Sequence, residues 1–321
     1  MNHENKHMEG EPMKKLIVVL LIMAVMSLVG SFSALTQAQN PASQVKPTFL
    51  APTPGIYVNG WPAFTVSYPK EWVKQPFRPG EVIRVAAPDS KTFPPIPNFV
   101  ISVFPSPLPI DNWSKILLPI FSKSGRDFKI INDKPSQLKD GTPAQEAELE
   151  WVRNDGVKVN MLVLNTKKED IWIPIIVASD KGKVEEDLKN YAYSLTFQSS
   201  REEPLKVPSD VREFFDKHCS DIVSGDVGRI MTKYSDQFSH NGMTKASLEQ
   251  WLRNDRFSPI QRGVTSVEAT VTFFEAQGDK AYLDGFFSSK GSNDARPMKV
   301  PMARQQIIKE NGQWKWYGNR K

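Results

Sequence analysis

The sequence predicts an α+β protein of two domains: an antiparallel sheet flanked by helices, then helices that lead into a curved antiparallel sheet. Three observations support this fold class. The stretch AQEAELEWV alternates apolar and acidic residues, as a strand with one packed face does. The polar stretch QSSREEPLKVPSD, 198–210, separates two segments of different pattern. The second segment begins with helical patterns and ends with two hairpin signals.

The composition sets outer limits on function. The chain has 321 residues, enough for two ordinary domains, and its 40% hydrophobic and 24% charged residues are typical of globular proteins. The net charge of +5 comes from Lys and Arg scattered along the chain, so we expect no nucleic-acid partner. The single cysteine, Cys219, excludes an intramolecular disulfide and a CxxC metal or redox site.

Residues 1–38 have the pattern of a secretory signal peptide. Two lysines precede an uncharged stretch, Leu16–Leu35, and small residues at Thr36 and Ala38 precede a cleavage site before Gln39. The alternative is an uncleaved membrane anchor, because about 20 uncharged residues can span a bilayer. With either reading the rest of the chain works outside the cytoplasm, in the periplasm or the extracellular space. Whether the chain starts at Met1 or Met13 is left open.

The first domain, 55–200, follows a Pro-rich linker at 39–54 and is rich in strand patterns. These are FTVSYPKEW (64–72), NFVISVFP (98–105), AQEAELEWV (144–152), VKVNMLVLNT (157–166), DIWIPIIVAS (170–179) and SLTF (194–197). Helices are predicted at 110–123 and 183–193. Pro174 cannot donate to a ladder, so its strand is expected at an edge or a bulge. Glu146, Glu148 and Glu150 are expected to face water.

The second domain, 209–321, follows a linker at 201–208 and begins with three predicted helices. Ser209, Asp226 and Thr244 are the predicted N-caps, and the first helix is expected to end near Gly225. Strand patterns follow at 264–276, 280–289, 298–310 and 313–318. Gly278-Asp279 and Asn311-Gly312 are hairpin signals because these residues tolerate positive φ.

Three stretches of the first domain resemble the PsbP-like family of extracytoplasmic domains, which includes DcrB-like proteins. They are FTVSYPKEW (64–72), DGTPAQEAELEW (140–151) and VEEDLKNYAYSLTF (184–197). The resemblance implies an antiparallel sheet flanked by helices. It supplies no catalytic motif.

The second domain resembles the nuclear transport factor 2-like (NTF2-like) superfamily, which includes SnoaL and ketosteroid isomerase. The resemblance rests on REFFDKHCSDIVSGDVGRIMTKYSDQFSHNGMTKASLEQWL (212–252) and IIKENGQWKWYGN (307–319). It implies a helix-backed curved sheet, a cone-shaped α+β barrel whose mouth is a pocket. Catalytic members need a carboxylate or a His-Asp pair inside the cone. No such acid-base set is recognisable in this sequence.

The stretch YSDQFSHNGMTK, 234–245, is expected to be a loop between the second and third helices, beside the mouth of the cone. One hypothesis places Tyr234 and His240 at the pocket, where they can donate a hydrogen bond and move a proton. The other packs Tyr234 on the first helix and leaves His240 in solvent. Asn241-Gly242 is expected to form a turn.

Two further residues carry candidate chemistry. His218 lies on the apolar face of the first helix and is expected to be a core histidine. Asp284 shares a strand face with Tyr282 and Phe286, so it points either into the cone or outward to solvent. The candidate ligand-binding residues are Tyr234, His240, Trp251, Phe273, Tyr282, Asp284, Phe286 and His218. We expect no catalytic residue, metal site or cofactor.

The sequence therefore predicts an exported, non-enzymatic binding protein. Its C-terminal cone domain would hold a small apolar ligand or a protein partner of the cell envelope. The alternatives are a small lyase or isomerase of the ketosteroid isomerase-like type and a structural envelope component. Membrane contact is expected only if the N-terminal segment is uncleaved. A dimer through the curved sheet is left open.

Overall fold

The computed structural model describes residues 55–198 and 203–318, apart from 76–79, 91, 93, 94, 107, 124, 241, 242, 256, 257, 293, 295 and 303. The predicted signal segment, the Pro-rich linker and the Asn241-Gly242 turn lie outside the described residues. We call 55–198 the N-terminal half and 203–318 the C-terminal half. The predicted domain boundaries stay predictions.

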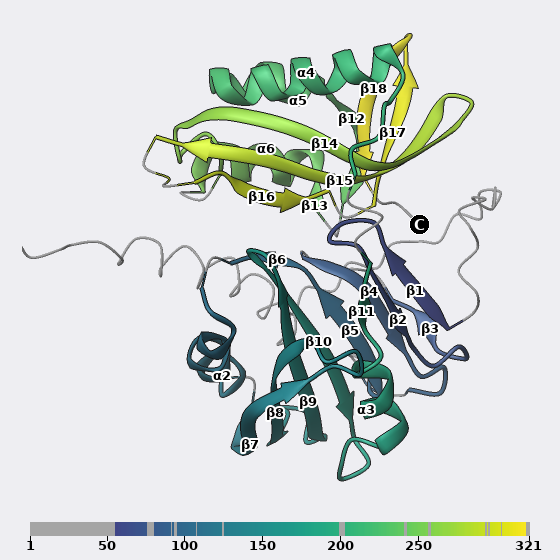
Figure 1. Cartoon of the computed structure of the whole chain (residues 1–321), viewed down its shortest axis with the longest axis vertical. Helices are drawn as coiled ribbons and strands as arrows, with labels where there is room; N and C mark the ends of the chain where they lie inside the picture. Colours follow the sequence, from purple (N-terminus) through teal and green to yellow (C-terminus); the bar gives the residue numbers. More distant parts are fainter. Residues whose placement is uncertain are drawn as a thin grey trace, which may run out of the picture.

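The described chain is rich in sheet and has few helices, and its sheets are mainly antiparallel, as the sequence predicted (Figure 1). In the N-terminal half, a three-stranded sheet has the order β1 (Ile56–Asn59), β2 (Phe64–Ser67), β11 (Thr196–Phe197). An eight-stranded sheet has the order β3 (Val73–Lys74), β4 (Glu81–Ala86), β5 (Asn98–Ser102), β10 (Ile171–Ser179), β9 (Lys158–Lys168), β8 (Pro143–Val152), β7 (Arg126–Gln137), and β6 (Phe104–Pro105) pairs with β10.

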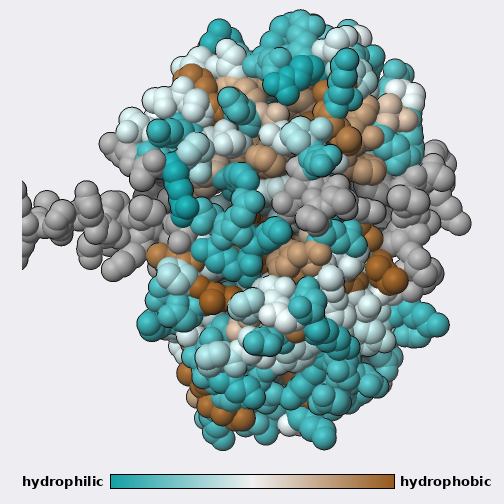
Figure 2. All heavy atoms as spheres, viewed as in Figure 1, coloured by the Kyte–Doolittle hydropathy of each residue, from teal (hydrophilic) through white to brown (hydrophobic). Residues whose placement is uncertain are grey.

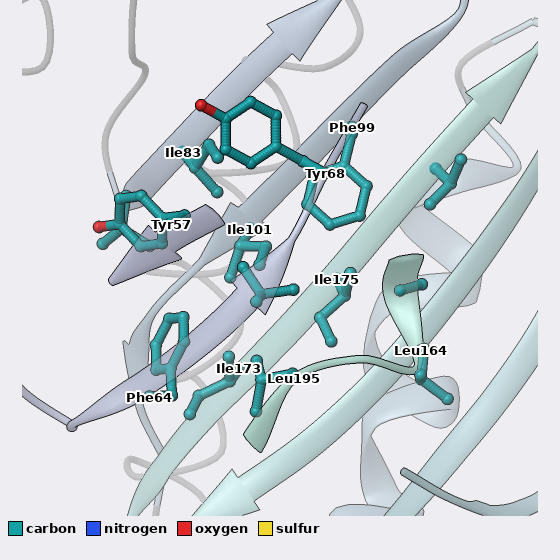
Figure 3. Close-up of a cluster of buried hydrophobic side chains, with 14 of the residues drawn as sticks. Tyr57, Phe64, Tyr68, Ile83, Phe99, Ile101, Leu164, Ile173, Ile175 and Leu195 are labelled. Atoms are coloured by element: carbon teal, nitrogen blue, oxygen red, sulfur yellow. The ribbon is translucent and has the colours of Figure 1, made fainter. Parts of the chain in front are cut away.

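Both faces of the eight-stranded sheet are packed. One face meets the three-stranded sheet and helix α3 (Glu186–Ala192), and Figure 3 shows residues such as Phe64, Phe99 and Leu195 gathered there. The other face meets the short helix η1 (Ile110–Asn112) and α2 (Trp113–Phe121), with Trp113 fully buried. Two apolar layers on opposite faces of one sheet give this half its core.

The expectation that the glutamates of β8 face water is wrong for Glu146, whereas Glu150 is partly exposed and pairs with the exposed Lys129 and Lys158. Glu146 is buried and accepts a hydrogen bond from the Tyr193 hydroxyl, while Glu148 pairs with Lys189. Alternation correctly placed Ala147 on the opposite face. It could not show that the chain around α3 would return to cover the acidic face and supply partners for the carboxylates.

Pro174 lies in β10, which is a central strand, so the expectation of an edge strand is wrong. On one side Pro174 is opposite Asn165 of β9. On the other side β6 pairs with Ile171 and Trp172, and the β5 pairing begins only at Ile175. Pro174 therefore stands at the break between two short partner strands, where the ladder needs no N–H donor.

The C-terminal half starts with α4 (Ser209–Ser224), α5 (Val227–Thr232) and, later, α6 (Lys245–Asn254). The Asp226 and Thr244 side chains accept bonds from the helical N–H groups of Arg229 and Ser247, which confirms both predicted caps. Gly225 ends α4 in the left-handed conformation, with φ 71°. The Ser209 cap is wrong, because Ser209 is the first helical residue and follows Pro208.

The sheet of the C-terminal half has seven strands, and α4 packs against β14 (Figure 1). Its order is β13 (Met243–Thr244), β12 (Tyr234–His240), β18 (Gln313–Gly318), β17 (Gln305–Glu310), β15 (Lys280–Gly291), β14 (Val264–Gln277), and β16 (Met298–Pro301) pairs with β15. The hairpins at Gly278-Asp279 and Asn311-Gly312 are confirmed. Asn311 and Gly312 have φ of 52° and 77°, as their turn requires.

Figure 2 shows one face, on which polar residues predominate and hydrophobic residues form small separate groups. No helix within the described ranges is long and apolar enough to cross a membrane.

Candidate functional site

Helix α4 carries His218 into the interior of the C-terminal half. Its buried face is formed by residues at helical spacing, including Val211, Phe214, Phe215 and His218, and the long strand β14 packs against it. His218 is only 2% exposed. The predicted location of this histidine, on the apolar face of the first helix, is confirmed.

Aromatic rings surround His218. We call His218, Phe214, Tyr234, Phe287 and Trp316 the aromatic cluster. The centroid of the His218 ring lies 5.7 Å from that of Tyr234, 5.9 Å from that of Phe287 and 5.6 Å from that of Trp316. Phe214 stacks on His218 with an angle of 8° between the ring planes and a centroid distance of 6.3 Å. These contacts bring α4, β12, β15 and β18 together around one imidazole.

Polar atoms inside this environment lack protein partners. The Nδ1 of His218 and the Nε1 of Trp316 are buried and have no hydrogen-bond partner. The same is true of Nε1 of Trp251, a half-buried residue of α6 that packs against the same core. Buried polar atoms are normally hydrogen-bonded, so three exceptions in one core need an explanation.

Burial keeps His218 uncharged. Loss of solvation, reinforced by the nearby charge of Lys233, lowers the pKa of His218 to about 3. Burial also lowers the pKa of His240 to about 4. Both imidazoles are therefore neutral near pH 7, and each has one donor and one acceptor nitrogen.

The expected loop at 234–245 is largely a strand. Tyr234–His240 forms β12, which pairs in parallel with β18, with Tyr234 opposite Trp316 and Ser239 opposite Gly318. A side chain at Gly318 would overlap the carbonyl oxygen of Ser239, so glycine permits this close approach. Tyr234 does contact the first helix, through His218, and His240 is half-buried, with its ring near Phe238.

The four predicted residues of β14 and β15, Phe273, Tyr282, Asp284 and Phe286, lie on the opposite side of the sheet. Leu283 and Phe287 of β15 pack against the α4 side, whereas Phe286 packs on Trp61 of the N-terminal half, with 4.5 Å between ring centroids. Asp284 shares the face of Phe286. Of the remaining predicted residues, Phe273 is paired with Asp284 and Tyr282 with Glu275, both across the β14–β15 ladder. The eight candidate residues thus form two groups rather than one site.

Asp284 is buried where the two halves meet, so neither expectation for it is correct. Its Oδ2 accepts from the N–H of Gly60 at 3.0 Å, and its Oδ1 accepts from the N–H of Gly285 at 2.9 Å. Arg304 donates to the carbonyl oxygen of Val58 and lies over the Tyr57 ring, 4.6 Å from its centroid. Burial raises the pKa of Asp284 to about 6, against the opposing effects of Arg304 and the backbone donors.

This arrangement separates the groups that an acid-base mechanism would need. His218 projects from α4 towards Phe287 on one side of β15, whereas Asp284 faces the N-terminal half from the other side of β15. Within the residues that the structure covers, no three His, Cys, Asp or Glu side chains are grouped as metal ligands.

Comparison with known proteins gives structural similarity only. No protein-family model matches the chain, and no curated protein matches it in sequence. The PsbP protein of Synechocystis sp. PCC 6803 is similar at 15% identity over 50% of this chain and 98% of that chain, with a TM-score of 0.32. An NTF2-like protein of unknown function from Pseudomonas putida KT2440 is similar at 12% identity over 38% of this chain and 84% of that chain, with a TM-score of 0.27.

A protein of Bacteroides thetaiotaomicron VPI-5482 is similar over a larger share, 81% of this chain and 88% of that chain, at 14% identity and a TM-score of 0.31. The similar structures therefore include PsbP and NTF2-like proteins, the two groups that the sequence resembles.

Proposed function

We propose that this chain is an exported, non-enzymatic binding protein, and that its aromatic cluster holds a small, mainly apolar ligand. The observation that carries the proposal is the pair of buried nitrogens without partners, His218 Nδ1 and Trp316 Nε1, within a cluster of packed aromatic rings. Leaving one such atom unsatisfied costs about 1–3 kcal/mol. A ligand with one hydrogen-bonding group would satisfy these atoms.

The surroundings specify the ligand's character. Phe214, Phe287 and the ring of Tyr234 offer apolar contact, and the neutral imidazole of His218 offers no charge to attract an ion. The ligand is therefore uncharged where it meets the cluster. It carries a hydrogen-bond acceptor on an apolar body, because the Nε1 of Trp316 can only donate, whereas the Nδ1 of His218 can donate or accept.

The same geometry supports the proposal that the protein is not an enzyme. A histidine with a pKa of about 3 is a poor proton carrier near neutral pH, and Asp284 faces the other way. Burial raises the pKa of the Cys219 thiol to about 12, so the thiolate nucleophile is not formed. Export rests on the uncharged stretch Leu16–Leu35 and its flanks.

The test uses a fluorescent apolar amine, N-phenyl-1-naphthylamine, titrated into the purified protein. The wild type is expected to bind it, and His218→Phe, which keeps an aromatic ring but removes both nitrogens, is expected to bind about tenfold more weakly. Val223→Ala, an exposed change on the same helix, is the matched control and should bind as the wild type does. Equal binding by wild type and His218→Phe, or no binding by the wild type, contradicts the proposal.

A further inference from the structure

The two halves of the molecule have separate cores. Among the described residues, the buried clusters of the N-terminal half and the buried cluster of the C-terminal half share no member. The halves meet where the turn after β1 and the turn between β9 and β10 contact β15, β16 and Arg304, and we call this region the joint. Units with separate cores can move relative to each other unless a large hydrophobic interface fixes them.

The ion pairs at the edge of the joint are exposed. Both come from the turn between β9 and β10. Glu169 lies 2.7 Å from the Nζ of Lys299, and Asp170 lies 2.8 Å from the Nη2 of Arg296. These side chains have exposed fractions of 37–61%. Exposed ion pairs contribute little to stability, and salt screens them, so the edge holds the halves together only weakly.

The centre of the joint is a buried carboxylate. Asp284 accepts a hydrogen bond from the N–H of Gly60 across the joint, and Phe286, on the same face of β15, packs on Trp61. If the halves part, this hydrogen bond breaks and the carboxylate returns to water. Water stabilises the ionised form of a carboxylate far more than its neutral form. Ionisation of Asp284 therefore favours the open joint.

Other titratable groups surround this carboxylate. Arg304 donates to the carbonyl oxygen of Val58 and lies over the ring of Tyr57. Burial raises the pKa of Tyr57, so its phenol is neutral near pH 7. Further groups around the joint come from β3, β14, β15 and β16, and they are Lys74, Glu275, Tyr282 and Lys299. Burial raises the pKa of Asp284 to about 6, and so outweighs the charge of Arg304 and the backbone donors, which favour the ionised form.

We propose that the joint responds to pH: with Asp284 protonated the halves stay together, and with Asp284 ionised they part more often. Between the ordinary pKa of 3.8 and the pKa of about 6 in the closed joint, the closed form binds more protons than the open form. Acid therefore favours closure, and closure weakens as the pH rises through this window. The ratio of open to closed molecules should increase about a hundredfold between about pH 3 and about pH 7.

Amide hydrogen exchange of the purified protein, followed by NMR at low salt across this pH range, tests the proposal. Protection of an amide is its exchange rate compared with that of an unfolded chain at the same pH. The amide of Gly60 reports opening of the joint, whereas Leu162 of β9 and Ile307 of β17, in central strands, report unfolding of each half. In the wild type, Gly60 should be less protected than the other two amides, and its protection should fall about a hundredfold as the pH rises. In Asp284→Asn the protection of Gly60 should stay constant, because asparagine does not titrate.

Two further variants separate opening of the joint from local motion of the turn after β1. Arg296→Gln removes an ion pair that involves no residue of this turn, and it should speed exchange at Gly60 about threefold at every pH. Asp279→Asn, in the exposed β14–β15 turn, is the control and should behave as the wild type does.

Four results would each overturn the proposal. Protection of Gly60 does not change with pH in the wild type, or Asp284→Asn keeps the wild-type trend. Gly60 is as strongly protected as Leu162 and Ile307, which would mean that the halves unfold rather than part. Arg296→Gln leaves exchange at Gly60 unchanged. The outcome does not depend on a ligand in the aromatic cluster.

Discussion

Replacement of Asp284 by Asn gives the sharpest test of the contact between the two halves. Asp284 is 1% exposed and accepts hydrogen bonds from Gly60 of one half and Gly285 of the other. Asparagine keeps the size of the side chain and removes the buried charge. The asparagine side chain has only one acceptor oxygen, so its NH2 group must face the N–H of either Gly60 or Gly285. This mismatch costs the same free energy at every pH, because the asparagine side chain does not titrate. The pH dependence therefore isolates the carboxylate.

The size of the effect follows from the pKa. Burial raises the pKa of Asp284 from its ordinary value of 3.8 to about 6. Between these values the folded protein binds more protons than the unfolded chain, so stability falls as pH rises through the window. A shift of this size amounts to about 3 kcal/mol in the free energy of unfolding. The wild type should therefore lose about 3 kcal/mol relative to Asp284→Asn between about pH 4 and about pH 7.

Urea unfolding of both proteins, followed by tryptophan fluorescence across this pH range, measures the difference. Comparison with the variant removes the contributions of His218 and His240. Their lowered pKa values act in the opposite direction, because their contribution to stability is lost as pH falls. Asp279→Asn, an exposed change in the β14–β15 turn, is the control and should show no such trend. A wild-type minus Asp284→Asn difference that stays constant with pH would refute the reasoning.

Three further predictions concern single residues. Gly60→Ala should destabilise the protein by about 2 kcal/mol in urea unfolding, because the added carbon would overlap the Asp284 carboxylate; unchanged stability would argue against this contact. Asp226→Ala should cost about 1 kcal/mol through loss of the α5 cap, with Asp226→Asn retaining most of it in the same assay. Gly312→Val should lower the melting temperature, because a β-branched residue resists the positive φ of this turn; an unaltered temperature would mean that the turn has changed its conformation.

Local signals in the sequence predicted the turns and most helix ends. Asn311-Gly312 and the caps Asp226 and Thr244 depend only on neighbouring residues, so a single sequence contains what is needed. Features that depend on distant partners were missed. The strand β12 forms because β18 lies beside it, and Pro174 is tolerated because β6 and β5 leave a break opposite it.

The candidate site was predicted only in part, because a bulge changes which residues of β14 face inward. Ala269 and Val271 belong to the core on the α4 side, and uninterrupted alternation would place Phe273 there too. The ladder shifts between Val271 and Phe273, so Phe274 packs against that core instead. Alternation in QWKWYG was the available signal for Trp316, a further residue of this core with a buried nitrogen that has no hydrogen-bond partner.

Native mass spectrometry of the protein purified from its own host tests the central claim most directly. The wild type is expected to carry a small noncovalent mass that is released on gentle activation. His218→Phe, isolated in the same way, should lack it, while Val223→Ala should retain it. A wild-type mass equal to that of the bare chain, or the same adduct on His218→Phe, would contradict the assignment of a ligand to the aromatic cluster.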